Sequence, residues 1–488
     1  MFRIAMNARW CITLLVCLWC VSPSTQQEVC LSRLASQIQS VLDQPQYARC
    51  SLGMLAEGRF PGDSRFHTLY AYNQEAYRTP ASNNKVLTCA AAFVALDMSS
   101  RFTTELRFNV TSSSIDTLCV IGKGDPSLDS SSLQRIGAKV ADASKVVNRL
   151  FVDSTSFVGD PFPTSWEWED IMAPYGAAPT AFAYDENSLT VQVTPAASVN
   201  LAPSVVVGNG DTGVVVMNTA STGSSSSSNT LSVQYSPGGC GAIEVSGSIP
   251  MGSSSISVGL SALNTTDFFA SELVAALQQQ QAITVNEVHI GRCPVLQNGV
   301  SEEVASFDTL LTLMNHTLQV SDNLYAELFL RHLGLANAGS TPVDTVASGV
   351  EAVQKVLSGS LGVNPDDFVQ VDGSGLSRHN LVSPAGLVQL FEGMLNRSDA
   401  AVFKSLLPVG GESGSLANRF VGTPGQGKVH AKTGTMTGVD ALSGYVDNVH
   451  FDALVFSIIV NTCQLHASSV RSGIDAVVNL LVELNPSC

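Results

Sequence analysis

A lysine follows a serine by three residues at the predicted start of a helix, in the stretch TPASNNKVLTC (79–89). Thr79 is expected to cap this helix and Pro80 to occupy its first position. Residues three apart share a helix face, so the amine of Lys85 should lie beside the hydroxyl of Ser82. Burial and the helix dipole both disfavour a charged amine, and a neutral amine can accept the serine proton. The pattern therefore predicts a serine nucleophile with a lysine base.

Two later stretches carry residues of the same chemical kind. VSDNLYAEL places Ser321 and Asn323 at the start of an apolar helical run, and HAKTGTMTG places Lys432 just before a predicted strand. Ser-x-x-Lys, Ser-Asp-Asn and Lys-Thr-Gly are together the motif set of class A β-lactamases and penicillin-binding proteins. Because all three occur here in the same order, we interpret them as one catalytic site.

The spacing of the motifs separates this chain from a β-lactamase. Ser82 and Ser321 are 239 residues apart, more than a compact lactamase holds between these motifs. The chain instead resembles the D-alanyl-D-alanine carboxypeptidase/endopeptidase family, the penicillin-binding proteins of low molecular mass with a large insertion after the first motif. The resemblance covers nearly all of the mature chain and includes IGKGDPSL (121–128), WEWEDIMAPYGA (166–177), DGSGLSRHNLVSP (372–384) and SGYVDN (443–448).

The resemblance implies a role for each motif residue. Ser82 would be the acylated nucleophile and Lys85 its general base. Ser321 would relay a proton to the leaving nitrogen, and Asn323 would hydrogen-bond the peptide group of the substrate. Lys432 would supply positive charge that disfavours protonated Lys85 and orients the terminal carboxylate.

The third motif is implied to bind the end of the substrate. Thr433 and Thr435 would offer hydroxyls to the terminal carboxylate, with Gly434 between them. The backbone N–H groups of Ser82 and Thr435 would form the oxyanion hole.

Three further residues are implied to line a pocket for a substrate side chain, namely Asp170, Tyr175 and Arg378. A carboxylate there would suit an ammonium group such as the distal amine of diaminopimelate. The alternative is that all three are ordinary structural or surface residues.

Charge and histidine usage narrow the range of partners. The net charge is −16 and no long Lys/Arg run occurs, which argues against nucleic acid and anionic membrane surfaces as partners.

The mechanism needs no metal or other cofactor, and the eight histidines show no HExxH spacing. His430 is expected to be a strand neighbour of Lys432, and His379 a structural loop residue. Asp440 and Asp447 have no partner evident in the sequence.

The predicted function is that of a secreted serine-type D-Ala-D-Ala carboxypeptidase that also has scope for D,D-endopeptidase action. Its partners would be peptidoglycan stem peptides or related D-amino-acid peptides, with β-lactams as covalent inhibitors. Two alternatives stay open. The same fold could serve as an esterase, D-aminopeptidase or amidase, or it could be a binding protein without catalysis, against which the intact motifs argue.

The N-terminus is typical of a secretory signal peptide, predicted here as residues 1–24. Arg3 and Arg9 precede an apolar run of about 12 residues, shorter than the ~20 needed to span a bilayer. An uncleaved anchor is the alternative, and no transmembrane segment is expected after cleavage. The predicted location is extracellular, or the periplasm or cell-wall space of a bacterium.

Eight cysteines remain behind the predicted signal, an even number that favours disulfides in an oxidising compartment. Sequence neighbours suggest the pairs Cys30–Cys50, Cys89–Cys119, Cys240–Cys293 and Cys463–Cys488, one of 105 possible pairings. Glycosylation sequons occur at Asn109, Asn264, Asn315 and Asn396.

The length of 488 residues implies two to four domains at ~100–200 residues each. The expected fold is α/β, a penicillin-binding/β-lactamase-like serine-acyltransferase domain whose antiparallel sheet is covered by helices. This catalytic domain would be discontinuous, formed by 25–100 and 297–488. The insertion, 101–296, would hold a small α/β module (101–184) and a β-rich module (185–296), the latter because short Val/Thr/Ser-rich runs alternate with turn residues.

Overall fold

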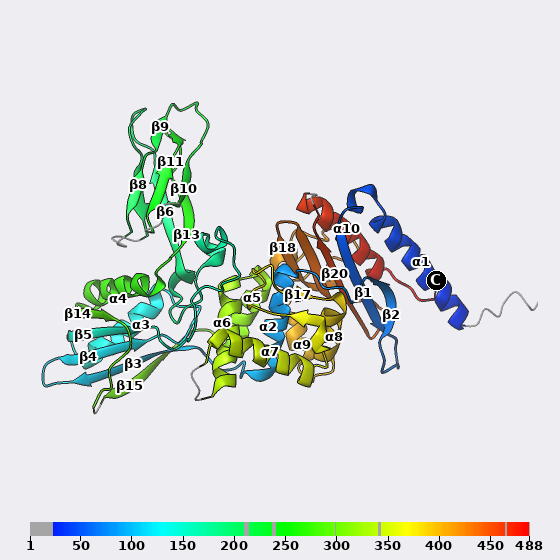
Figure 1. Cartoon of the computed structure of the whole chain (residues 1–488), viewed down its shortest axis with the longest axis horizontal. Helices are drawn as coiled ribbons and strands as arrows, with labels where there is room; N and C mark the ends of the chain where they lie inside the picture. Colours follow the sequence, from blue (N-terminus) through cyan, green and yellow to red (C-terminus); the bar gives the residue numbers. More distant parts are fainter. Residues whose placement is uncertain are drawn as a thin grey trace, which may run out of the picture.

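The computed structural model describes residues 23–208, 214–236, 241–297, 299–339, 343–463 and 466–487. Both ends of the chain build one antiparallel sheet, with the strand order β18-β19-β20-β1-β2 (Figure 1). Its strands are β1 (Ser51–Arg59), β2 (His67–Tyr72), β18 (Val429–Met436), β19 (Val439–Val446) and β20 (Ala453–Asn461).

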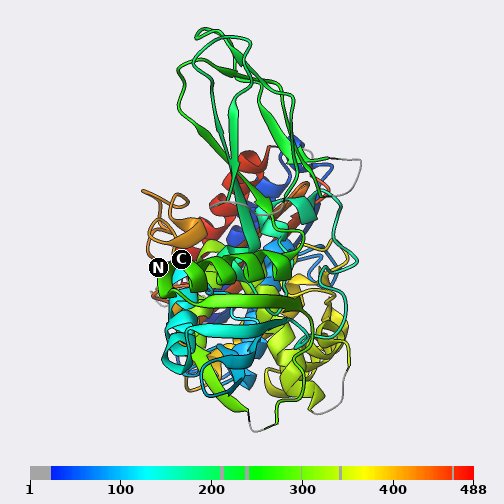
Figure 2. The same cartoon turned by 90° about the vertical axis from the view of Figure 1, so that its left-hand side faces the viewer.

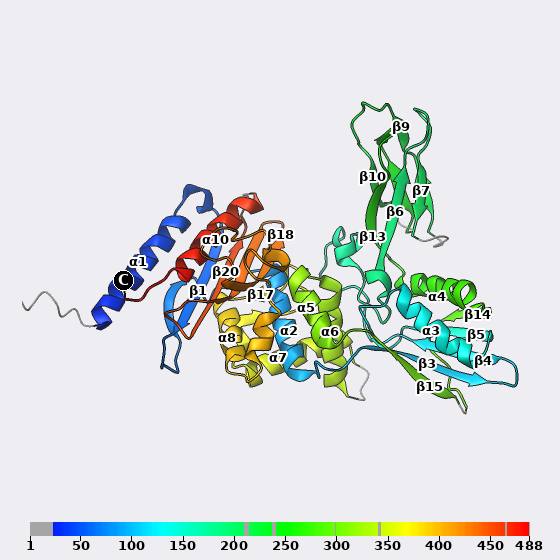
Figure 3. The ribbon, with the colours of Figure 1, turned by 180° about the vertical axis from the view of Figure 1, so that it is seen from behind.

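Helices cover both faces of this sheet. Met54 of β1 packs with Ile38 of α1 (Pro23–Leu42) and Val478 of α10 (Ala467–Val482). The next residue, Leu55, points to the opposite face, as strand geometry requires, and belongs to the core that contains Phe391 of α8 (Pro384–Leu395). Figure 3 shows α1 and α10 together on one side of the sheet. The expected antiparallel sheet covered by helices is confirmed.

A group of helices lies between this sheet and the inserted region (Figure 1). Its members share the apolar core that also receives one face of the sheet. They are α2 (Asn84–Ala95), α5 (Leu310–Val320), α6 (Asn323–Ala338), α7 (Thr345–Ser360) and α9 (Ala400–Ser405). A small pair of strands, β16 (Phe368–Val369) and β17 (Leu381–Val382), brackets the loop that contains DGSGLSRHN.

The inserted α/β module contains a second five-stranded sheet, of order β14-β5-β4-β3-β15. Its elements are β3 (Thr103–Val110), β4 (Ile115–Ile121), α3 (Ser130–Ala143), β5 (Val146–Asp153), α4 (Thr265–Gln281), β14 (Thr284–Ile290) and β15 (Val300–Ala305). Residues 265–305 therefore return to the module that begins near residue 103. The predicted β-rich module, 185–296, included α4 and β14, and this boundary differs because the partners of a sheet need not be adjacent in sequence.

The β-rich part of the insertion projects away from both sheets (Figures 1 and 2). It has a small core of its own, which includes Val191, Tyr235 and Val245. Its strands are β6 (Ser188–Thr194), β7 (Ser204–Val207), β8 (Val216–Asn218), β9 (Ser221–Gly223), β10 (Ser232–Tyr235), β11 (Ile243–Ser246), β12 (Ser248–Pro250) and β13 (Ile256–Ser261).

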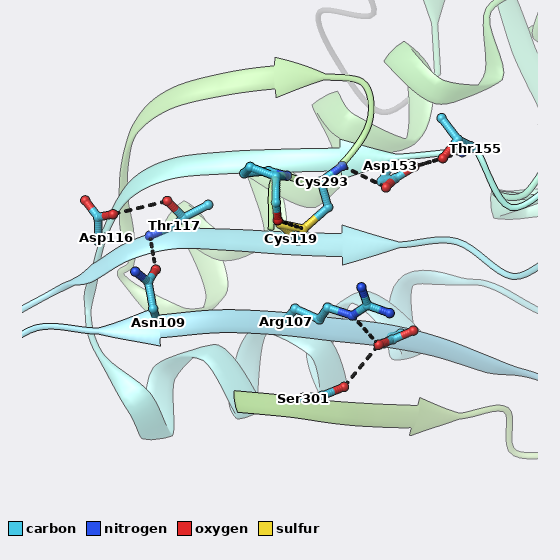
Figure 4. Close-up of a disulfide and its surroundings, with 11 residues drawn as sticks. Arg107, Asn109, Asp116, Thr117, Cys119, Asp153, Thr155, Cys293 and Ser301 are labelled. Carbon is cyan, nitrogen blue, oxygen red and sulfur yellow. Dashed lines mark hydrogen bonds and ion pairs between the residues drawn. A yellow bond between two sulfur atoms is a disulfide. The ribbon is translucent and has the colours of Figure 1, made fainter. Parts of the chain in front are cut away.

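Two disulfides join segments that are remote in sequence. Cys50–Cys463 links the start of β1 to the end of the adjacent strand β20. Cys119–Cys293 links β4 to the segment after β14 (Figure 4), where the Cys293 N–H donates to Asp153 Oδ2 at 2.8 Å. Strand pairing thus determines which cysteines meet.

The four predicted cysteine pairs are wrong, because they assumed that neighbours in the sequence would pair. Cys89 is a free thiol buried in the core. Cys30 is disulfide-bonded, but not to Cys50. Cys240 and Cys488 lie outside the described residues.

The predicted signal peptide lies almost entirely outside the described residues, which start at Pro23. Over the part of the chain that the structure covers, none of the helices combines the length and apolarity that a membrane crossing requires.

The helix that follows Ser82 begins differently from the prediction. A 3₁₀ turn, η2 (Ala81–Asn83), precedes α2, and Ala81 has a left-handed φ of 48°. Thr79 does not cap the helix. Its backbone instead exchanges hydrogen bonds of 2.8 and 3.0 Å with the side chain of Asn461 at the end of β20. The chain therefore turns sharply before α2, and the 3₁₀ turn presents Ser82.

This turn packs closely against β18 because Gly434 has no side chain. A Cβ on Gly434 would collide with the Pro80 carbonyl oxygen and would lie 2.7 Å from the side-chain amide of Asn83. Gly434 thus sets the distance between the third motif and Ser82.

We expect Gly434→Ala to lower the free energy of unfolding by about 1–3 kcal/mol, because the added methyl overpacks this contact. Gly359→Ala in α7 is the matched control. Its Cβ meets nothing within 4 Å, and alanine should raise stability by up to ~1 kcal/mol as the better helix former. Denaturant unfolding of both variants measures the difference. An unchanged unfolding free energy for Gly434→Ala would contradict the close approach.

Candidate active site

The side chains of Ser82 and Lys85 meet as the helical spacing predicted. The amine of Lys85 lies 2.9 Å from Ser82 Oγ. Ser82 is half-buried in the 3₁₀ turn η2, and Lys85 is fully buried in the first turn of α2. The amine therefore has the serine hydroxyl as one of its few neighbours.

Two further oxygens accept hydrogen bonds from the Lys85 amine. Asn323 Oδ1 lies 2.6 Å away and the Ser374 carbonyl oxygen 2.8 Å away. Burial lowers the pKa of Lys85 to about 8, against the opposing pull of the nearby Asp322, Asp372 and Glu327 carboxylates. A substantial share of this lysine is consequently neutral near pH 8 and can accept a proton.

The second motif occupies a sharp turn between α5 and α6. Ser321 has a left-handed φ of 68° and ends α5, while Asp322 Oδ1 caps α6 by accepting from the Tyr325 N–H at 3.0 Å. Asn323, the first residue of α6, donates from Nδ2 to the Tyr175 carbonyl oxygen at 2.8 Å. Its amide thus links Lys85 to the insertion.

The third motif brings a second lysine to the site. Lys432 is fully buried on β18, and its amine donates to Ser321 Oγ at 2.8 Å and to the Thr433 carbonyl oxygen at 3.0 Å. Burial, with the neighbouring Lys85, lowers the pKa of Lys432 well below its usual value. The structure therefore unites Ser82, Lys85, Ser321, Asn323 and Lys432 in one connected group.

The loop 372–380 holds one hydrogen-bond acceptor of the Lys85 amine in place. Asp372 is fully buried and accepts from the N–H groups of Gly375 at 2.8 Å and Ser377 at 2.7 Å. The Trp166 indole N–H also donates to it at 3.0 Å. These bonds fix the Ser374 carbonyl that faces Lys85.

Glu327 is a functional candidate that the sequence analysis missed. It is fully buried on α6, one turn after Asn323, and its Oε1 accepts from the Ser374 N–H at 2.7 Å. Burial and the neighbouring Asp372 raise the pKa of Glu327. The signal available in the sequence was the position of Glu327, a charged residue within an apolar helical run. Charged residues are rarely buried unless they are paired.

A cavity of about 370 Å³ opens above Ser82, Ser321 and Asn323. One wall is acidic, because Glu167 and Glu169 line it together with Asp170. The lining also includes Thr435 and the adjoining residues 436 and 437.

The three residues predicted for the side-chain pocket all line this cavity. Tyr175 Oη donates to Asp170 Oδ1 at 3.1 Å. Arg378 Nε donates to Glu167 at 3.1 Å, and its Nη1 donates to the Thr437 carbonyl oxygen at the same distance. Glu167 and Glu169 were not predicted, although they stand in the quoted stretch WEWED.

The hydroxyls of Thr433 and Thr435 both have hydrogen-bond partners within the protein. Thr433 Oγ1 donates to Ser415 Oγ at 2.8 Å. Thr435 Oγ1 lies 3.3 Å from Asp440 Oδ1, and Arg471 Nη2 lies 3.3 Å from Thr435 Oγ1. Asp440, which had no partner evident in the sequence, pairs with Arg471.

A group with metal-binding side chains lies beside the second motif. The ligand atoms of Glu186, His316 and Asp322 lie within 4.8 Å of one another. The Asp322 carboxylate, 3.6 Å from His316 Nε2, raises the pKa of His316, and Asp322 also caps α6. We interpret the group as ion pairs that hold the turn between α5 and α6.

The two histidines singled out in the sequence lie outside the catalytic group. His430 stands in β18, and its Nε2 is 3.0 Å from Asp447 Oδ2. The backbone N–H of His379 donates to Ser377 Oγ at 3.1 Å within the loop 372–380.

Comparison with known proteins gives matches along most of the chain. The model of the D-Ala-D-Ala carboxypeptidase 3 (S13) family matches residues 34–484. The penicillin-sensitive carboxypeptidase A of Dictyostelium discoideum is 31% identical over 464 residues, which cover 88% of this chain and 87% of the relative. The D-alanyl-D-alanine carboxypeptidase of Actinomadura sp. (strain R39) is 32% identical over 458 residues, which cover 88% and 81%.

Among solved structures, penicillin binding protein 4 of Haemophilus influenzae has a similar fold. The TM-score is 0.77 at 21% sequence identity, and the match covers 93% of this chain and 99% of that one. With the family match over residues 34–484 and the three motifs in contact, the chain belongs to the D-Ala-D-Ala carboxypeptidase 3 (S13) family.

Proposed function

We propose that this carboxypeptidase removes the terminal D-alanine of peptidoglycan stem peptides through an acyl-enzyme on Ser82. The observation that carries the proposal is the 2.9 Å contact between the buried Lys85 amine and Ser82 Oγ. A serine hydroxyl is a weak nucleophile until an adjacent base takes its proton. The lowered pKa of Lys85, about 8, supports that role.

Acylation begins when Ser82 Oγ attacks the carbonyl carbon of the penultimate D-alanine and its proton passes to the Lys85 amine. The backbone N–H groups of Ser82 and Thr435 stabilise the resulting oxyanion. The C–N bond then breaks, and the proton that Lys85 took from Ser82 passes through Ser321 Oγ, which is hydrogen-bonded to Lys432, to the departing nitrogen, so that Lys85 is neutral again. A water molecule, deprotonated by Lys85, hydrolyses the ester and restores Ser82.

Asn323 has two contacts within the protein in addition to the substrate contact that the resemblance implies. Its Oδ1 accepts from Lys85 and its Nδ2 donates to the Tyr175 carbonyl oxygen. We infer that Asn323 first of all positions the Lys85 amine, and that it reaches the substrate peptide group only when the Tyr175 contact is exchanged.

The acidic wall supports a substrate with a cationic side chain. Glu167, Glu169 and Asp170 place three carboxylates around one guanidinium, that of Arg378. The excess negative charge favours an ammonium group, such as that of a lysine or diaminopimelate side chain.

We further propose that the protein is secreted and that β-lactams acylate Ser82. The printed name of the Dictyostelium relative describes it as penicillin-sensitive. The two disulfides that the structure describes support an oxidising compartment. The sequons at Asn264, Asn315 and Asn396 are exposed, which permits glycosylation there.

Ser82→Ala should abolish the adduct that benzylpenicillin forms, because it removes the hydroxyl that lies 2.9 Å from the buried Lys85 amine. Intact-mass spectrometry, with a peptide map of the wild-type adduct, makes the measurement. Ser468→Ala, on the exposed side of α10, is the control and should label like the wild type. An adduct that persists in Ser82→Ala would exclude Ser82 as the nucleophile.

The pH dependence of kcat/KM should report Lys85. Protonated Lys85 cannot accept the serine proton, so kcat/KM should fall as the pH drops below about 8. Glu327→Gln keeps an oxygen for the Ser374 N–H but removes a carboxylate that raises the pKa of Lys85. The acid limb of the profile should then move to lower pH by about one unit. A limb that stays in place or moves to higher pH would contradict this assignment.

Asp170→Asn should weaken the preference for a cationic side chain. The measurement is the ratio of the kcat/KM values for two peptides, one with lysine and one with norleucine before D-Ala-D-Ala. The ratio should fall about tenfold in Asp170→Asn, as for loss of a charged hydrogen bond. Asp116 pairs with Arg149 in the insertion. Its variant Asp116→Asn is the control and should leave the kcat/KM ratio unchanged. An equal ratio in all three proteins would refute the role of the acidic wall.

A further inference from the structure

A second guanidinium, that of Arg471, lies next to Thr435, which is one of the residues that line the cavity. Arg471 of α10 donates from Nε to Asp440 Oδ1 at 3.0 Å and from Nη2 to Thr435 Oγ1 at 3.3 Å. Thr435 lines the cavity together with Ser82. Asp440 stands opposite Thr435 in the pairing of β18 and β19, so the strand register holds this contact in place.

The lysines of the site are poor partners for a carboxylate. Burial lowers the pKa of both Lys85 and Lys432, and the neighbouring Lys85 lowers that of Lys432 further. An arginine keeps its charge at every relevant pH. A substrate that ends in a carboxylate therefore needs a guanidinium for a permanent positive partner.

The other guanidinium at the cavity is already engaged. Arg378 is paired with Glu167, and the wall beside it also carries Glu169 and Asp170. A carboxylate placed there would meet the repulsion of these three groups. Arg471 faces one carboxylate, Asp440, through its Nε edge.

Arg471 also has hydrogen-bond donors to spare. A guanidinium has five N–H donors, and two of those of Arg471 are used by the residues that the structure describes. The Thr435 hydroxyl has one proton and lies 3.3 Å from the Asp440 carboxylate that can accept it. The Arg471 side chain is 39% exposed.

We propose that Arg471 binds the C-terminal carboxylate of the departing D-alanine and thereby selects peptides that end at this residue over peptides that continue beyond it. The proposal rests on the proposed function, since it takes the carbonyl carbon of the scissile bond to lie at Ser82. Asp440 acts as a positioning residue that orients the guanidinium through its Nε.

The test compares two peptides in the full-length protein, one ending in D-Ala-D-Ala and one ending in its C-terminal amide. The kcat/KM for release of D-alanine or D-alaninamide is measured for the wild type, Arg471→Gln and Arg397→Gln. Glutamine keeps donors for Asp440 but removes the charge. Arg397 is the matched control, because it also pairs with an aspartate, Asp399 at 2.8 Å, but its guanidinium bonds no residue of the cavity lining.

We expect Arg471→Gln to lose at least tenfold in kcat/KM on the free acid and to keep its activity on the amide. Arg397→Gln should retain the wild-type ratio of the two substrates. Acylation of Ser82 by benzylpenicillin and by its methyl ester gives a second acid–neutral pair, in which Arg471→Gln should slow only the acid.

An acid-to-amide ratio in Arg471→Gln equal to that of the wild type would overturn the proposal. Equal losses on both substrates, or on both penicillins, would also overturn it, since they indicate a structural effect. A wild type that releases no D-alanine and forms no penicillin adduct would instead refute the proposed function itself.

Discussion

Burial of the Lys85 amine is the constraint on which the rest of the site depends. An ammonium without water is costly unless partners surround it, whereas a neutral amine is tolerated. Here the partners are three oxygens, from Ser82, Asn323 and Ser374. They come from three separate segments: the turn before α2, the first residue of α6 and the loop 372–380. Chemistry at Ser82 thus requires these three segments to be held together.

The fold meets this requirement through close backbone packing. A Cβ on Gly375 would collide with the Ala81 carbonyl, and a Cβ on Gly373 would lie 2.6 Å from the Ala326 oxygen. The loop 372–380 therefore packs between η2 and α6. Ser374 lies between these two glycines, so the same close contacts also place its carbonyl oxygen as an acceptor for Lys85. The insertion joins this network through the Tyr175 carbonyl, which accepts from Asn323.

Contacts between residues close in the sequence could be predicted, whereas the pairing of residues far apart in the sequence could not. The i to i+3 spacing brings Lys85 to Ser82 in any helix, so this contact was predictable. Burial of Glu327 and Asp372 was not, because their partners are backbone N–H groups of a loop that folds only in its tertiary context. The cysteine pairs failed for a similar reason: Cys50 and Cys463 meet through the pairing of β1 with β20. Thr79 was assigned as a cap because the left-handed Ala81 and the 3₁₀ turn have no clear sequence signature.

The central claim, that burial lowers the pKa of the Lys85 amine to about 8, can be measured directly. The chemical shift of ¹³Cε-labelled lysines, followed by NMR against pH and assigned with Lys85→Arg, reports the protonation of each amine. The account predicts that the signal of Lys85 titrates with a pKa near 8 in the free enzyme. A signal for Lys85 that titrates near the ordinary lysine value of about 10.4 would contradict it.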